Sequence, residues 1–200
     1  MTETAVVPRP AASLLVLRQT AEGPAVLMGL RGAGHTFMPN RLVFPGGAVD
    51  AADHGAPVAS PLPAAALRRL QVSADASLAA ALGVAAAREL LEESGLSLGV
   101  PPQLAGLDYL CRAVTPPSMS KRFDARFFVV DEAAVAGTLA GSGELEDLRY
   151  FALTEALTLD LAGATRGVLE KFCAWLALTP ELRAARTRTP VMFSRVWQEE

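Results

Sequence analysis

Cysteine is scarce in this sequence, and its scarcity argues against a structural zinc site. The 200 residues contain two cysteines, Cys111 and Cys173, and each lies among apolar neighbours. A zinc site needs closely spaced pairs of cysteines or histidines, and these two residues are 62 positions apart (173 − 111). We therefore expect two buried free thiols.

Long apolar runs and clustered basic charge are also missing. No stretch approaches the roughly 18 apolar residues of a membrane span. The N-terminal region carries Glu3 and Pro8 and lacks the apolar core of a signal peptide. The formal net charge is −3, with no basic stripe of the kind that binds a nucleic-acid polymer. These absences predict a cytoplasmic protein whose partners include neither a membrane nor a nucleic-acid polymer.

Apolar residues are abundant enough for a core, because they make up 51% of the chain. A domain usually has about 100–200 residues, so we expect a single domain over 1–200 with a loose tail at 1–10. Local patterns predict strands at 13–17, 25–30, 104–114, 126–130 and 148–153, and helices at 64–72, 77–94, 132–140 and 165–178, with Ser77 capping the second helix and Gly95 ending it. Strands alternating with a few helices indicate an α/β fold.

The most distinctive stretch is 88–96, which reads R-E-L-L-E-E-S-G-L. Glu89, Glu92 and Glu93 stand at i, i+3 and i+4, so a helix places them on one face. Like charges at this spacing repel one another, and a bound divalent cation offsets that repulsion. Mg²⁺ fits because it takes oxygen ligands and keeps waters and substrate phosphates in its shell. Arg88 can hold a carboxylate through its planar guanidinium.

This stretch resembles the second half of a Nudix box, R-E-apolar-x-E-E-x-G-apolar. The first half of that box is a glycine followed six positions later by an acid, and Gly47 and Asp53 have this spacing. Arg88 follows Asp53 by 35 positions where the family has eight, so about 27 residues, at roughly 54–78, are inserted within the box. The family usually has Glu where Asp53 stands, so Asp50 is an alternative for that role.

Other motifs are similar to one Nudix subgroup, which comprises coenzyme A diphosphatases of animals and related bacterial proteins with an insert at the same place. These motifs lie at 27–31, 37–39, 43–47, 115–117, 122–128, 144–145 and 148–150. The resemblance covers about residues 11–178. It implies the Nudix fold, a mixed β-sheet sandwiched between α-helices.

The resemblance also implies roles for the acidic residues. The expected metal ligands, for Mg²⁺ or Mn²⁺, are Gly47 through its carbonyl, Glu89, Glu92 and Glu93. The expected catalytic residues are Arg88, Glu89, Glu92 and Glu144, the last as an acid supplied by a loop opposite the helix, with Glu146 as a second candidate. The alternative for these loop acids is that they are merely solvated.

Three arginines are candidate contacts for the phosphates of a substrate: Arg31, Arg122 and Arg126. Arg31 lies at a strand end, where an ordinary surface arginine is the alternative. Arg122 and Arg126 flank an aromatic pair, and pairing with Asp124 and Asp131 is the alternative for them. His35 is expected to be a loop residue rather than a catalyst.

These features favour a metal-dependent hydrolase that cleaves the diphosphate linkage of a nucleoside diphosphate linked to another group. Coenzyme A or an acyl-CoA leads the expected substrates, and ADP-ribose, a dinucleotide or a modified nucleoside triphosphate are the others. The alternatives are a Nudix-fold module that binds a nucleotide without cleaving it, and a structural domain with a solvated acidic helix. Segment 54–78 is a candidate lid, specificity wall or oligomer contact, and segment 180–200 a candidate contact in a homodimer.

Overall fold

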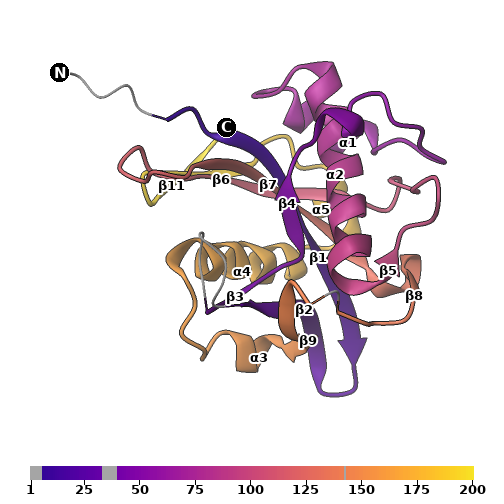
Figure 1. Cartoon of the computed structure of the whole chain (residues 1–200), viewed down its shortest axis with the longest axis vertical. Coiled ribbons are helices and arrows are strands. Elements are labelled where there is room, and N and C mark those ends of the chain that lie inside the picture. Colours follow the sequence, from indigo (N-terminus) through magenta and orange to yellow (C-terminus); the bar gives the residue numbers. More distant parts are fainter. Residues whose placement is uncertain (1–5, 33–39, 142) are drawn as a thin grey trace.

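A large mixed β-sheet organises the molecule (Figure 1). The computed structural model describes residues 6–32, 40–141 and 143–200. The strands of the main sheet are β1 (Arg9–Thr20), β2 (Gly23–Arg31), β3 (Arg41–Val43), β4 (Gly46–Ala48), β6 (Asp108–Val114), β7 (Phe123–Asp131), β9 (Leu145–Ala152), β10 (Pro190–Phe193) and β11 (Val196–Glu199). Their order is β11-β10-β6-β7-β1-β2-β3, with β4 paired to β1 and β9 paired to β2. β1 runs parallel to β7 and β6 parallel to β10, whereas the other pairs are antiparallel.

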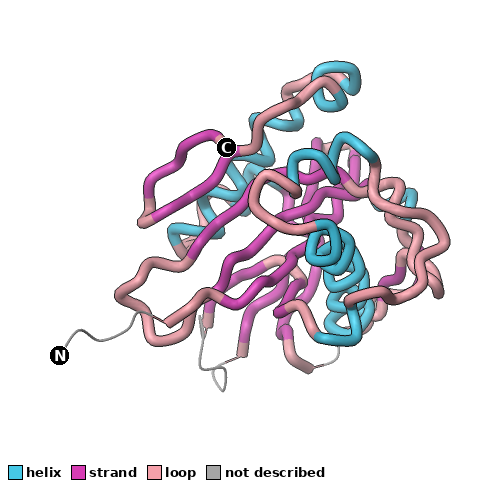
Figure 2. The backbone as a smooth tube through the Cα atoms, turned by 90° about the horizontal axis from the view of Figure 1, so that it is seen from above, coloured by secondary structure: helices cyan, strands magenta, loops and turns pink. Residues whose placement is uncertain are grey.

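Both faces of the sheet are buried, as the central strand β1 shows. Leu14 and Val16 belong to one hydrophobic cluster, while Leu15 and Leu17 belong to another. Successive side chains of a strand point to opposite faces, so a strand of continuous apolar residues supplies two cores. The first cluster is covered by helices α1 (Ala64–Leu70) and α2 (Ala76–Ser94), and the second by α3 (Leu153–Ala156) and α4 (Gly163–Leu176) (Figure 2). The predicted α/β fold, a mixed sheet between helices, is confirmed.

Helix α2 ends where the sequence indicates but begins differently. Gly95 has φ 72°, and its N–H donates to the carbonyl of Leu91 at 2.9 Å. At the other end Asp75, not the expected Ser77, is the N-cap, because its Oδ1 accepts from the Leu78 N–H at 2.8 Å. The Ser77 hydroxyl instead lies 2.9 Å from Nδ1 of His54. This contact joins the two ends of segment 54–78.

Segment 54–78 packs onto the domain rather than extending from it. A 3₁₀ turn, Ala51–Asp53, leads into the segment, and α1 lies in its middle, as predicted. Leu62, Ala66 and Leu70 are buried in the cluster that lies under α2. The segment therefore extends the hydrophobic core on the α2 side of the sheet.

The prediction of a helix at 132–140 is wrong. Residues Glu132–Ala134 form a single 3₁₀ turn capped by Asp131, whose carboxylate accepts from Ala133 N at 2.9 Å. The chain then forms the short strand β8 (Ala136–Gly137), which pairs with β5 (Leu96–Ser97). Gly137 has φ 105°, which a helix does not allow, and tertiary pairing therefore overrides the local helix preference.

The N-terminal end differs from expectation. Residues 9 and 10 belong to β1, so the loose tail predicted at 1–10 is too long, and its first five residues lie outside the described part. The C-terminal segment forms α5 (Pro180–Ala184), β10 and β11. Because β10 pairs with β6, this segment belongs to the chain's own sheet. No helix in the described ranges has the length and apolar character needed to span a membrane.

Candidate functional site

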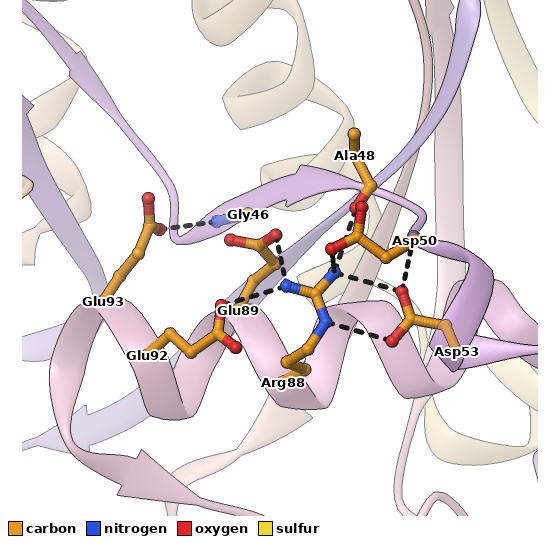
Figure 3. A network of polar contacts seen from close by, with 8 residues as sticks. All are labelled: Gly46, Ala48, Asp50, Asp53, Arg88, Glu89, Glu92 and Glu93. Atoms are coloured by element: carbon orange, nitrogen blue, oxygen red, sulfur yellow. Dashed lines mark hydrogen bonds and ion pairs between the residues drawn. The ribbon is translucent and has the colours of Figure 1, made fainter. Parts of the chain in front are cut away.

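The acidic face of α2 lies against the turn and short strand at residues 45–48 (Figure 3). Glu93 is 3% exposed, and its Oε2 accepts a hydrogen bond from the Gly46 N–H at 2.8 Å. Glu89 is largely buried, with 13% of its side chain exposed, whereas Glu92 is 56% exposed. The structure thus brings the three predicted carboxylates together, two of them at the protein interior and one facing out.

Two glycines allow this close approach. A Cβ on Gly47 would lie 2.2 Å from Oε1 of Glu89, and a Cβ on Gly46 would lie 2.2 Å from Oγ of Ser13. Both glycines belong to β4, which pairs with β1 through Ser13↔Gly46 and Ala12↔Gly47. Glycine is required here because the backbone itself touches the helix on one side and the central strand on the other.

Arg88 connects the carboxylates to the start of segment 54–78. Its guanidinium donates to Asp53 through Nε and Nη2, both at 3.0 Å, and to Glu89 and Glu92 through Nη1, at 2.8 and 2.9 Å (Figure 3). Nη2 also donates to the carbonyl of Ala48 at 3.0 Å. Asp50, the alternative to Asp53, lies farther away, at 3.8 Å from Nη2. The guanidinium therefore fixes the positions of four surrounding groups at once.

The local electrostatics leave this cluster short of positive charge. Burial raises the pKa of Glu93 to about 7; the Gly46 N–H opposes that rise, and the charge of Glu89 adds to it. Burial also raises the pKa of Glu89, although its hydrogen bond to Arg88 acts in the opposite direction. One guanidinium is not enough to neutralise these groups, so a further cation would stabilise their ionised forms.

Arg31 and Glu144 influence the α2 carboxylates electrostatically. Leu145, next to Glu144, is the β-partner of Arg31. The charge of Glu144 raises the pKa of both Glu89 and Glu93, and the charge of Arg31 lowers that of Glu93. Glu146, the second candidate, is paired with Leu30 one step farther along β9. The loop acid and the strand-end arginine predicted from the sequence therefore act on the α2 carboxylates.

The other two candidate arginines are committed elsewhere. Arg126 is 1% exposed, forms an ion pair with Asp124 at 2.7 Å, and donates to the carbonyl of Ser73 at 3.1 Å. Ser73 lies in the turn just before α2, and Glu89 is roughly 20 Å along that helix from its start at 1.5 Å per residue. The structure thus places Arg126 apart from the α2 carboxylates, buried and paired with Asp124, which is the alternative weighed for it. Contact of Arg126 with a substrate stays a prediction.

Arg122 is also held by backbone groups away from the acidic face. Its guanidinium donates to the carbonyls of Thr115 and Val6, the former at 3.0 Å. Its neighbour Phe123 pairs with Arg9, four residues before the Ser13 that contacts β4. The structure therefore does not place Arg122 with the α2 carboxylates, and His35 lies outside the described residues.

Sequence reasoning missed the backbone groups that complete the site. The Gly46 N–H that binds Glu93 and the Ala48 carbonyl that binds Arg88 are independent of side-chain identity. Only the Pro-Gly-Gly turn signalled that the backbone approaches another group there. Asp53 was a candidate, and its bidentate contact with Arg88 distinguishes it from Asp50.

The donor set suits a hard divalent cation. Within the described ranges no three His, Cys, Asp or Glu side chains converge as a ready-made metal cage. The α2 carboxylates are engaged by Arg88 and by the Gly46 N–H. Carboxylate and backbone carbonyl oxygens are nevertheless the ligands that Mg²⁺ and Mn²⁺ prefer. The close packing of the buried carboxylates Glu89 and Glu93 against the partly buried backbone of Gly46 and Gly47 is the observation that favours a cation at this place.

Comparison with solved structures identifies the architecture. A NUDIX hydrolase from Alicyclobacillus acidocaldarius superposes with a TM-score of 0.65 and 25% sequence identity, over 90% of this chain and 97% of that one. This chain has the Nudix hydrolase fold. A MutT NUDIX hydrolase from Burkholderia pseudomallei shares the Nudix fold at a TM-score of 0.54 and 21% identity, covering 83% and 98% of the two chains. The NUDIX domain of Shewanella oneidensis NrtR, solved with ADP ribose, has the same fold, with a TM-score of 0.54 and 15% identity over 86% of this chain and 90% of that one.

Sequence comparison alone does not find this relation. No protein-family model matches the chain, and no curated protein matches it. The Nudix fold implied by the residues at 88–96 is therefore supported by the three-dimensional likeness.

Proposed function

We propose that this protein is a divalent-metal-dependent hydrolase that cleaves the diphosphate linkage of a nucleoside diphosphate joined to another group. The observation that carries the proposal is the buried pair Glu89 and Glu93, packed against Gly46 and Gly47 with their pKa values raised by burial. Its Nudix neighbours, which include hydrolases, support the same class of reaction.

In this proposal, Glu89, Glu92, Glu93 and the carbonyl of Gly47 hold Mg²⁺ or Mn²⁺. The metal, when bound, neutralises charge on the diphosphate and lowers the pKa of a water ligand. Arg88 positions Glu89 and Glu92, and Asp53 in turn positions Arg88. These contacts fix the carboxylates before the substrate arrives, which is the kind of preorganisation that lowers an activation barrier.

Proton transfer and substrate binding fall to the neighbouring residues. Glu144 or one of the α2 carboxylates accepts the proton of the attacking water. Arg31, at the end of β2, contacts a phosphate oxygen, for which a guanidinium is well suited. Arg122 is retained only as a weaker candidate, because its guanidinium is bound to Thr115 and Val6.

Coenzyme A or an acyl-CoA leads the proposed substrates, and ADP-ribose or another nucleotide follows. The support for coenzyme A is the resemblance of the sequence motifs and of the long insert after Asp53 to one Nudix subgroup. The ion pair of Asp53 with Arg88 is consistent with segment 54–78 being an insert within one box. The cytoplasmic location and the homodimer stay predictions.

A nucleotide-binding module without catalysis is the alternative. Such modules usually lack some of the box acids, whereas Glu89, Glu92 and Glu93 are all present here. The enzyme is therefore favoured.

The deciding experiment offers the purified chain Mg²⁺ or Mn²⁺ with a mixture of coenzyme A, acetyl-CoA, ADP-ribose, NADH and nucleoside triphosphates, and reads the products by mass spectrometry. We expect one compound to be cleaved at its diphosphate by the native chain and by neither Glu92→Gln nor Glu93→Gln. If the native chain cuts nothing while Mn²⁺ and a nucleotide still bind, the binding module replaces the hydrolase.

A further inference from the structure

A cavity of about 520 Å³ lies away from the acidic face of α2, where α1 and α5 meet the loop that leads into β6. Segment 54–78 supplies one wall, including Pro63 and Ala66, and the C-terminal segment supplies another, including Pro180 and Arg183. Residues 105–108 and Trp175 of α4 close it. The cavity is thus formed mainly by segment 54–78 and the C-terminal segment, to which the proposed hydrolysis assigns no role.

One wall of this cavity contains a buried guanidinium with an unused donor. Arg69 lines the cavity and is 3% exposed. Its Nη2 donates to Oδ1 of Asp108 at 2.6 Å and its Nη1 donates to the carbonyl of Tyr109. Its Nε is buried within the protein and has no hydrogen-bond partner. A buried donor without an acceptor costs stability, so the hydrogen-bonding capacity of this guanidinium is only partly met by the protein.

Positive charge exceeds negative charge around Arg69. Asp108 is shared, because its Oδ2 also accepts from Arg186 at 2.9 Å and from Trp175 Nε1 at 2.7 Å. Arg183 stacks on the Trp175 ring at 3.8 Å and uses Nε and Nη2 on backbone carbonyls. Two guanidiniums therefore share the Asp108 carboxylate, and a third, that of Arg183, lies beside the same cavity. Burial lowers the pKa of Arg69, and the charge of Arg186 lowers it further.

We propose that this cavity, called here the Arg69 pocket, is a second ligand site that binds a small organic anion. Its phosphate or carboxylate group would lie beside Arg69 and Arg183, and its apolar body would pack against Trp175 and the two prolines, Pro63 and Pro180. An anion supplies negative charge beside the two guanidiniums that line the cavity, and its oxygens are acceptors for guanidinium N–H groups.

The test uses the full chain in EDTA, so that metal-dependent binding at the α2 carboxylates does not contribute. Phenyl phosphate, benzoate and inorganic phosphate are titrated at constant ionic strength, with sodium chloride as the control. Trp175 and Trp197 are the only tryptophans, so a Trp197→Phe background makes the fluorescence report on the pocket. We expect saturable binding of phenyl phosphate or benzoate, stronger than that of inorganic phosphate.

The variants separate this pocket from general charge effects. Arg183→Gln and Arg69→Lys should each weaken binding about tenfold or more. Arg68→Gln, an exposed neighbour on the same helix, should leave the affinity unchanged, as should Glu93→Gln at the acidic site. Arg183→Gln keeps the test decisive if Arg69→Lys fails to fold. Absence of saturable binding below about 10 mM, or equal affinity in Arg183→Gln and Arg68→Gln, overturns the proposal.

Discussion

Single residues at the acidic site trade stability for function, and Glu93 shows this most directly. Its carboxylate is 3% exposed, with one hydrogen bond, from Gly46. The pKa of Glu93 in the folded protein is about 7, above the ordinary carboxyl value of the unfolded chain. Between these two pKa values the folded chain therefore binds more protons than the unfolded chain. The resulting contribution to stability is fully present below the unfolded pKa and is lost as the pH rises through about 7.

Glu93→Gln should therefore stabilise the metal-free protein while removing hydrolysis. At about pH 8 the free energy of unfolding should rise by on the order of 1–3 kcal/mol, because a buried charge is removed, and at about pH 4 it should change little. Urea titrations in EDTA measure the free energy of unfolding at both pH values. Glu92→Gln is the control, since Glu92 is 56% exposed. An equal change at both pH values would contradict the assignment of the effect to ionised Glu93.

Gly47 should be intolerant of even one added methyl group. In Gly47→Ala the new Cβ would lie 2.2 Å from Oε1 of Glu89, so that carboxylate must move. A displacement of about 1 Å in a catalytic group costs roughly a hundredfold in rate, and we expect a loss between about tenfold and a hundredfold in kcat. Gly163→Ala, where a Cβ meets nothing within 4 Å, is the matched control. Normal turnover by Gly47→Ala would show that Glu89 need not stay where it is.

At the scale of elements, helix α2 positions all three carboxylates, and its start is the testable part. Asp75→Ala removes the side chain that accepts from Leu78 N–H and should cost about 1 kcal/mol. Ser77→Ala should cost less, because the Ser77 hydroxyl contacts only His54. Thermal denaturation compares the two, with Asp75→Asn expected to retain most of the stability. A larger loss of stability in Ser77→Ala than in Asp75→Ala would show that Ser77, the residue expected from the sequence, caps the helix.

The same helix shows how far sequence reasoning reaches. Its end at Gly95 and its acidic face follow from local chemistry, since a left-handed glycine and i, i+3, i+4 spacing are properties of the segment itself. Its start was missed because Asp75 and Ser77 are both good capping residues, and only the position of His54 separates them. The helix expected at 132–140 failed because pairing of β8 with β5 is decided by tertiary contacts.

Arg126 illustrates the corresponding limit for the site. Its sequence context, beside aromatic residues and a proline loop, gave equal reason to expect a phosphate contact or an ion pair. The ion pair with Asp124 and the bond to the Ser73 carbonyl become visible only in the three-dimensional arrangement. Glu144 and Arg31, by contrast, act on the acidic face because the β2–β9 pairing brings them to one edge.

At the scale of the molecule, the C-terminal segment is part of the sheet. Val191 is fully buried, Met192 is 8% exposed, and the backbone of Thr189 exchanges hydrogen bonds with Glu200. Truncation after Arg188 should therefore lower the Tm by several degrees, because it removes buried apolar surface and exposes the edge of β6. Differential scanning calorimetry measures this. Val196→Ala, at a β11 position whose side chain is 66% exposed, is the control and should leave the Tm nearly unchanged. An unaltered Tm after the C-terminal truncation would mean that β10 adds no net stability.

The hydrogen bond between His54 and Ser77 closes segment 54–78 at its base, next to the ion pair of Asp53 with Arg88. A loop whose two ends already meet can change in length at small entropic cost, about 0.6 kcal/mol for each doubling. Arg88 and the acidic face would then tolerate a shorter, longer or exchanged segment, provided that a replacement still covers the apolar surface now hidden by Leu62, Ala66 and Leu70. We therefore expect segment 54–78 to be replaceable as a unit, with the positions of Arg88 and the acidic face unchanged.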